Sequence, residues 1–184
     1  MSKYINSRSI YEHFPNSKIV PDRLTELINW LNISIDDGVG WFPEFRGEFL
    51  DWYLPPFDLS TYFGVFANLG DGSLLSYWFY EECDSSNPPI VLLCSDGELC
   101  VVARSIEELV ARLIDRSFPE NSCSTRMANF YLHDNGSWIQ KLEQWATEVW
   151  GLTNEVKQQL IVLNPEAGYP SLTEWMDSKA IETL

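Results

Sequence analysis

The stretch Asp-Gly-Ser-Leu-Leu-Ser-Tyr-Trp-Phe-Tyr-Glu-Glu, residues 71 to 82, decides the fold of this chain. After its opening turn it is apolar on both alternating sides, with Leu75, Tyr77 and Phe79 on one side and Leu74, Ser76, Trp78 and Tyr80 on the other. A strand with one face in water carries polar residues at every second position. The pattern therefore predicts a strand over residues 73–81 that is covered on both faces. The cover is either a set of helices from the same chain or, over a partly open aromatic face, a partner protein.

Three more strands are expected around this one. Apolar runs bounded by turn residues occupy residues 61–68, 90–94 and 99–103. The first run places Phe63, Val65 and Ala67 on one side and Tyr62 and Phe66 on the other. Asp96-Gly97 between the last two runs indicates a hairpin. A two-residue loop there sets Leu93 opposite Cys100 and points the thiols of Cys94 and Cys100 to different faces, whereas a three-residue loop pairs the two cysteines directly.

Helical patterns lie on either side of the strands. One helix opens at Pro21 or Asp22 and ends before Asp36. After the last strand, Ser105 and Glu108 form a capping box, in which the Ser105 hydroxyl accepts from the third helical amide while Glu108 reaches back. Later helices are expected from Ser137 to a stop at Gly151, over residues 153–163, and after a second capping box at Ser171 and Glu174.

Strands that follow one another through short loops leave no room for parallel crossovers. The order of elements therefore predicts an α+β fold, with a mostly antiparallel sheet of four or more strands and with N-terminal and C-terminal helices packed on it. A length of 184 residues fits a single domain, residues 1–184, whose C-terminal helical portion spans residues 137–184.

The net charge of the chain limits the classes of molecule that it can bind. Twelve Lys and Arg against 27 Asp and Glu give a formal charge of −15, which repels nucleic acid and anionic membranes. Between Asp36 and Asp84 the only basic residue is Arg46. Such a field attracts a basic protein and steers its approach. The alternative is that the charge serves solubility alone.

The spacing of the cysteines does not predict a metal site. Cys83, Cys94, Cys100 and Cys123 match no zinc spacing, so they are expected as small, reduced, buried side chains. The N-terminal residues carry no signal-like apolar stretch, and no run approaches the roughly 20 apolar residues of a membrane span. We therefore expect a cytoplasmic protein with no membrane segment.

No catalytic motif is present in the sequence. His13 and His133 are isolated from metal-ligating neighbours, and we expect neither to act in catalysis. Glu81 and Glu82 resemble an acid and base pair for glycoside hydrolysis, but adjacent strand residues point to opposite faces. The sequence therefore predicts a protein that is not an enzyme and holds no cofactor, with a carboxylate-pair hydrolase as the alternative that a shared cleft would reveal.

Residues 41–57 alternate aromatic and acidic side chains, and two interpretations apply to them. The rings either form a lid on the core with the carboxylates in water, or they form an acid-ringed interface for a basic partner. On the second interpretation, together with the acidic strand end near residue 81, the expected partner contacts are Trp41, Glu44, Glu48, Asp51, Trp52, Trp78, Glu81 and Glu82.

A set of motifs in fixed order runs through residues 61–115. They are Phe63-Gly64, Gly70-Asp71-Gly72-Ser73, Tyr77-Trp78, Pro89-Ile90-Val91-Leu92-Leu93, Ser95-Asp96-Gly97-Glu98 and Ala103-x-Ser105-x-Glu107-Glu108-Leu109. In this order and spacing the region resembles the core of the SUKH superfamily, the bacterial immunity proteins related to the yeast Smi and Knr cell-wall synthesis regulators. The Leu-Pro-x-x-Tyr segment usual in that family does not precede residue 61, where the aromatic segment stands instead.

The resemblance implies an α+β fold, no catalytic residues, and neutralisation of a cognate toxin, often a nuclease, by direct binding of a basic toxin domain. The matched residues are turn and core positions, so the resemblance implies no binding residues of its own. The alternative to an immunity function is that of a regulatory or scaffold protein of the same fold with no toxin partner.

Overall fold

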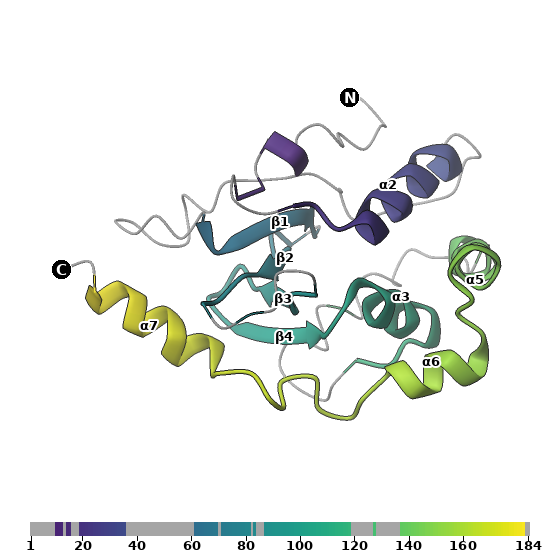
Figure 1. Cartoon of the computed structure of the whole chain (residues 1–184). Coiled ribbons are helices and arrows are strands. Elements are labelled where there is room, and N and C mark those ends of the chain that lie inside the picture. The colour runs from purple at the N-terminus through teal and green to yellow at the C-terminus, as the bar shows by residue number, and fades with distance from the viewer. Residues whose placement is uncertain are drawn as a thin grey trace.

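Four strands form one antiparallel sheet in the order β1-β2-β3-β4, so that each strand pairs with its neighbour in sequence (Figure 1). The strands are β1 (Phe63–Asn68), β2 (Leu74–Trp78), β3 (Ile90–Leu93) and β4 (Leu99–Ala103). This computed structural model describes residues 10–12, 14–15, 19–35, 61–69, 71–81, 83, 87–118, 127 and 137–182. The expected α+β fold with an antiparallel sheet is confirmed.

The loop between β3 and β4 has three residues, but it does not pair the two cysteines directly, as was expected for that length. Leu92 pairs with Cys100 and Leu93 with Leu99, and the Cys94 amide donates to the Glu98 carbonyl at 2.8 Å. The loop therefore consists of residues 95–97, with φ of +94° at Gly97. Because this register shifts the pairing by one residue, Cys94 and Cys100 lie on the same face of the sheet, and the prediction of different faces is wrong.

A bulge in β1 changes the face of one residue. The register between β1 and β2 shifts between Val65 and Ala67. A bulge inserts one residue and so reverses the alternation beyond it. Ala67 therefore packs with Phe66 on one face, whereas Phe63 and Val65 lie on the other. The expectation that Ala67 shares a side with Phe63 and Val65 is wrong for this reason.

The described helices begin and end near the expected residues. They are α2 (Asp22–Ile35), α3 (Ile106–Asp115), α5 (Ser137–Trp150), α6 (Asn154–Leu160) and α7 (Leu172–Glu182). The Ser105 hydroxyl accepts from the Glu108 amide at 3.1 Å, and Gly151 ends α5 with a φ of +68°. Helix α6 ends at Leu160, earlier than predicted. There Arg104, which follows β4, and Arg112 of α3 donate to the carbonyls of Leu160 and Val162.

Both faces of the sheet are covered by helices of the chain itself. The first face, which carries Leu75, Tyr77 and Phe79, packs against residues of α2, α3 and α5. The second face packs against α7, which lies on the opposite side of the sheet from α2 and α3 (Figure 1). Every residue of β2 is buried. Of the two alternatives for the stretch at 71–82, the described residues support the helix-covered core.

A close approach fixes one edge of the first face. The Phe14 ring lies against the backbone of Gly64 in β1, where an added Cβ would stand 2.7 Å from Phe14 Cζ. Phe14 also meets Tyr77 and Phe79 edge to face, at centroid distances of 6.1 and 5.5 Å. Gly64 is therefore required for the segment before α2 to pack on the sheet.

Among the described helices, none combines the length and the apolar character that a membrane crossing requires.

Candidate functional site

The structure describes two of the residues expected to contact a partner, Trp78 and Glu81. Trp78 is 0% exposed, and its ring packs against Tyr80 and against Trp175 of α7. Trp78 thus belongs to the core beneath α7, so the expected contact through Trp78 does not hold while α7 is in place. The other expected contacts, Trp41, Glu44, Glu48, Asp51, Trp52 and Glu82, lie outside the described residues, as do His13 and His133.

Glu81 serves as an anchor for α7. Its carboxylate accepts a hydrogen bond from Trp175 Nε1 at 2.9 Å and pairs with Lys179 Nζ at 2.5 Å. Partial burial alone would raise the pKa of Glu81, but the hydrogen bonds from Lys179 and Trp175 outweigh it and lower this pKa to about 2. The carboxylate is therefore charged at neutral pH and already engaged within the chain.

A different set of aromatic residues gathers at the surface between α2 and α5. Trp30 of α2 stacks on Trp145 of α5 at a centroid distance of 5.2 Å, and Trp145 lies 4.7 Å from the Trp150 ring. All three rings pack on the core but stay partly exposed. Tryptophan at a partly exposed, well-packed position is typical of interface hot spots. We call Trp30, Trp145 and Trp150 the tryptophan row.

Carboxylates border the tryptophan row at its Trp150 end. The Trp150 indole N–H donates to Glu26 Oε2 at 2.6 Å. The Arg23 guanidinium lies 5.3 Å from the Trp150 ring centre and pairs with both Glu26, at 2.9 Å, and Glu107, at 3.3 Å. Two carboxylates share this one guanidinium, so the charge of Arg23, Glu26 and Glu107 together is negative. We call these three residues the acidic rim.

A cavity of about 480 Å³ opens beside the rim. Its walls come from the start of α2, from β2, from the start of α3 and from the chain between Trp150 and Leu160, and they include Arg23, Tyr77, Glu107 and Trp150. The Tyr77 side chain is buried, and its hydroxyl has no hydrogen-bond partner among the described residues. Burial, and after it the charge of Glu107, raises the pKa of Tyr77 well above its ordinary value, so the hydroxyl stays protonated.

The tryptophan row was not predicted from the sequence. Its members come from helices far apart in the chain, and Glu26 and Trp150, which bond directly, are 124 positions apart. Within α2 the only local signal is the spacing of Glu26 and Trp30, which places an acid and a ring on one helix face. The expected combination of rings and acids thus occurs among the described residues, but at other positions.

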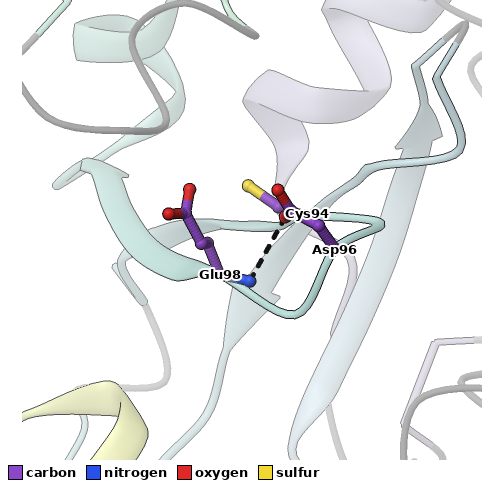
Figure 2. Close-up of side chains that lie close together, drawn as sticks. All are labelled: Cys94, Asp96 and Glu98. Atoms are coloured by element: carbon purple, nitrogen blue, oxygen red, sulfur yellow. Dashed lines mark hydrogen bonds between the residues drawn. The ribbon is translucent and has the colours of Figure 1, made fainter.

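The turn between β3 and β4 brings together three groups of a kind that bind metal ions. One ligand atom each from Cys94, Asp96 and Glu98 lies within 4.8 Å of the others (Figure 2). The Glu98 amide donates to Asp96 Oδ1 at 3.4 Å, and Cys94 faces Glu98 across the hairpin. The three-residue loop therefore accounts for the gathering, and the cluster carries no argument for a metal ion.

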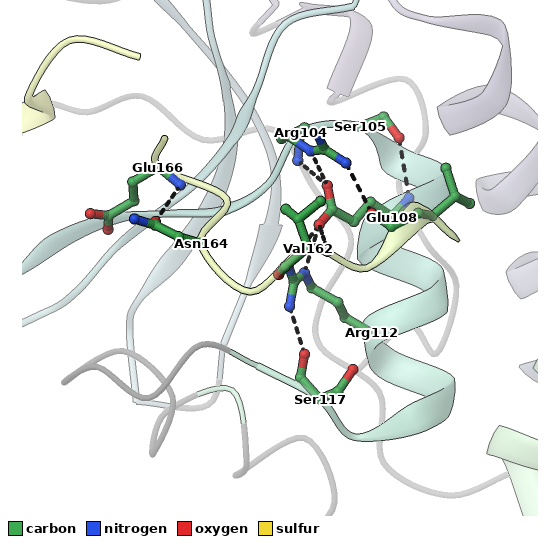
Figure 3. Close-up of polar contacts among 9 residues, drawn as sticks. Arg104, Ser105, Glu108, Arg112, Ser117, Val162, Asn164 and Glu166 are labelled. Atoms are coloured by element: carbon green, nitrogen blue, oxygen red, sulfur yellow. Dashed lines mark hydrogen bonds and ion pairs between the residues drawn. The ribbon is translucent and has the colours of Figure 1, made fainter. Parts of the chain in front are cut away.

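A buried charged network joins α3 to the chain beyond α6 (Figure 3). Glu108 and Arg112 are 1% and 2% exposed, and their ion pair measures 2.6 Å. Glu108 also accepts from the amide and the side chain of Arg104 at 2.9 and 3.1 Å, and Arg112 donates to the carbonyls of Ser117 and Val162 at 2.8 and 2.6 Å. Each of these charged groups is thus engaged within the chain, and removal of one partner would leave a buried charge unpaired.

The cysteines do not share one redox state. Cys83 and Cys94 are not in a disulfide, whereas Cys100 is disulfide-bonded. The expectation of reduced cysteines is therefore wrong for Cys100, and Cys123 lies outside the described residues.

Comparisons of the chain with protein-family models, with curated proteins and with solved structures found no match.

Proposed function

We propose that the chain is a non-enzymatic binding protein that holds a basic protein partner against the tryptophan row. The observation that carries the proposal is the row itself, three partly exposed rings bordered by the acidic rim. Large rings supply contact area when they are desolvated, and bordering acids steer a cationic surface toward them.

The distribution of charge supports a basic partner. Most of the described basic side chains lie in ion pairs with carboxylates: Arg23, Arg104, Arg112, Lys157 and Lys179. Lys157, for example, is 3% exposed and lies 2.8 Å from Asp115 and 2.7 Å from Glu143. Positive charge is thus used within the chain, and the excess of acids behind the formal charge of −15 is left to act outward.

The resemblance to the SUKH superfamily suggests which kind of protein this partner is. On that basis the protein is a bacterial immunity protein, and the partner is a toxin domain, possibly a nuclease, encoded beside it. Occlusion of the toxin by binding requires no reaction, which agrees with the internal use of the buried charged groups. The alternative is a regulatory or scaffold protein of the same fold, which a gene position far from any toxin gene would favour.

Co-purification with the product of the adjacent gene tests the proposal. We expect a stable complex that weakens with added salt, and cells that become toxin-sensitive when the chain is deleted. Trp145→Ala should weaken the complex about thirtyfold, because truncation of a hot-spot tryptophan costs ~2 kcal/mol or more. Leu163→Ala, at an exposed apolar residue beyond α6 that is not part of the tryptophan row, is the control and should change the affinity little.

Two results would overturn the proposal. One is the absence of any complex and of any change in toxin sensitivity. The other is a complex that Trp145→Ala leaves as tight as Leu163→Ala does. Circular dichroism of each variant separates the loss of a contact from the loss of the fold.

Glu26→Gln, which alters the acidic rim without truncating a ring, should lower the association rate of the complex.

A cytoplasmic site of action is part of the proposal. The disulfide at Cys100 bears on it, because disulfides seldom persist in a reducing cytosol. Rapid alkylation of thiols in intact cells decides the compartment. Alkylation of Cys100 without prior reduction supports the cytoplasm, whereas protection of Cys100 indicates an oxidising compartment.

A further inference from the structure

Helix α7 is the one described helix that covers the second face of the sheet. The buried cluster on that face combines strand residues with Leu172, Trp175 and Met176 of α7, and no other described helix contributes to it. Residues of α2, α3, α5 and α6 pack instead with the cluster of the first face, and α7 lies apart from them (Figure 1). The packing of α7 is therefore separate from that of the other described helices.

The contacts of α7 follow the spacing by which a helix from another chain is recognised. Leu172, Trp175 and Met176 are buried, and one turn later Lys179 Nζ lies 2.5 Å from the Glu81 carboxylate. Positions i, i+3, i+4 and i+7 are the anchors with which amphipathic helices bind in hydrophobic grooves. The described side chains between these anchors are exposed. One side of α7 thus makes its described contacts with the sheet.

Trp175 is the central anchor of α7. Its ring meets Tyr62 and Phe63 edge to face at centroid distances of 5.0 and 6.1 Å, and it meets Trp78 at 5.4 Å. Its indole N–H donates to Glu81 at 2.9 Å. A large ring that packs in a buried position and completes a hydrogen bond is typical of hot spots between chains. Loss of the Trp175 ring should therefore release α7 from the sheet.

The connector between α6 and α7, residues 163–171, is long enough to lead the helix elsewhere. Hydrogen bonds from Arg104 and Arg112 hold the chain as far as the carbonyls of Leu160 and Val162, at 3.0 and 2.6 Å. Beyond that point most residues of the connector are exposed, and its backbone hydrogen bonds close turns within the connector itself. A connector of this length spans roughly 30 Å when it is extended. It can therefore carry α7 to the sheet of a neighbouring copy.

We propose that the second face of the sheet is a helix-binding site, which α7 of a second copy can fill in place of the chain's own α7. Two copies then exchange this helix and form a dimer with the contacts of the monomer. The connector keeps the chain's own α7 at an effective concentration on the order of millimolar, so the monomer is favoured in dilute solution. The site is separate from the tryptophan row between α2 and α5, and it does not depend on the proposed function.

A fluorescent peptide of residues 171–182, added to the whole chain, tests the site. In the Trp175→Ala chain the own α7 lacks its central anchor, so we expect saturable binding of the peptide by fluorescence anisotropy. The wild-type chain should bind it at least about tenfold more weakly, because its own α7 competes. The peptide with Trp175→Ala should bind about thirtyfold more weakly than the unchanged peptide. Equal binding by the two chains, equal binding of the two peptides, or no saturable binding would overturn the proposal.

Indole NMR signals of the Trp175→Ala chain show where the peptide binds. The signal of Trp78 should shift, whereas that of Trp145 in the tryptophan row should stay unchanged. A shift confined to Trp145 would place the peptide elsewhere and overturn the proposal. Circular dichroism checks the fold of the chain. If Trp175→Ala does not fold, Lys179→Ala replaces it, because this variant keeps the ring and removes only the ion pair with Glu81.

A mixture of two variants of the whole chain tests exchange between copies. Trp175→Ala damages the helix and leaves the face intact, whereas Glu81→Ala damages the face and leaves the helix intact. Analytical ultracentrifugation of the mixture should show a species of twice the monomer mass, which neither variant forms alone at the same concentration. If the peptide binds but this species is absent, the occupant of the site is a helix of another protein, and exchange between copies is wrong.

Discussion

The indole Nε1 of Trp175 donates a 2.9 Å hydrogen bond to Glu81, and this contact joins α7 to the residues that follow β2. Lys179 binds the same carboxylate from the next turn of α7. The ring of Trp175 meanwhile packs edge to face on Trp78, with 5.4 Å between the ring centres. Glu81, which was expected to contact a partner, thus binds the helix that covers the second face of the sheet. The charge of its carboxylate therefore affects how strongly α7 packs on that face.

The packing of α7 on the sheet should weaken at low pH, because the Glu81 carboxylate that binds it becomes protonated. The pKa of Glu81 is lowered from 4.5 to about 2 by bonds that exist only in the folded chain, so the folded state binds fewer protons than the unfolded state between these values. The stability that Glu81 contributes is complete above about pH 4.5 and is lost as the pH falls toward 2. Urea denaturation at several pH values should show a steeper loss for the wild type than for Glu81→Gln. Parallel curves for the two proteins would contradict this prediction, and Glu174→Gln serves as the charge-matched control.

Trp78 should act on stability and not directly on binding. Because its side chain is fully buried against α7, Trp78→Ala should lower the free energy of unfolding by about 3–5 kcal/mol. Trp145→Ala removes a partly exposed ring and should cost clearly less. Equilibrium unfolding in urea measures both. A small loss for Trp78→Ala would mean that α7 does not cover the second face in solution.

Gly64 and Phe14 should show strong coupling. A methyl group at Gly64 overlaps the Phe14 ring, so Gly64→Ala should destabilise the protein by about 1–3 kcal/mol. In a Phe14→Ala background the ring is gone and the same substitution should cost far less. A double-mutant cycle from thermal or chemical unfolding measures the difference. Additive effects of the two substitutions would show that the ring does not lie over Gly64.

The buried ion pair of α3 should be costly to break from one side. Arg112→Met leaves the Glu108 carboxylate buried with Arg104 as its remaining charged partner, and we expect a loss of about 3–5 kcal/mol in the free energy of unfolding. The matched control is Arg104→Met, because the Arg104 side chain is 40% exposed and its contribution should be about 1 kcal/mol or less. Equal losses for both variants would contradict the network described here.

Local patterns were sufficient to predict the elements and their order. These patterns depend on contacts within a few residues. The structure confirms a buried strand within residues 73–81, although β2 spans only Leu74–Trp78, and it confirms Ser105 as the N-cap of α3 and the stop of α5 at Gly151. The capping box differs in one detail: Glu108 binds the amide of Arg104 instead of that of Ser105, because it also serves the buried pair with Arg112.

Features that depend on pairing across the chain were not predictable in the same way. The loop after β3 starts at Ser95, one residue before the Asp-Gly turn signal, and this shift decides the faces of Cys94 and Cys100. The contact of Trp30 with Trp145 exists only once α2 and α5 pack together, and neither helix indicates its partner in sequence. The predicted aromatic and acidic segment, residues 41–57, lies outside the described residues, and the tryptophan row could be located only from the packing of α2 and α5.

The consecutive pairing of the strands has a consequence for synthesis at the ribosome. Each strand needs only the one just made, so the hairpins can close while the chain is still emerging and before α5, α6 and α7 exist. Until α7 arrives, the rings of Phe63 and Trp78 face water, and nascent chains are most prone to stick to one another during that interval.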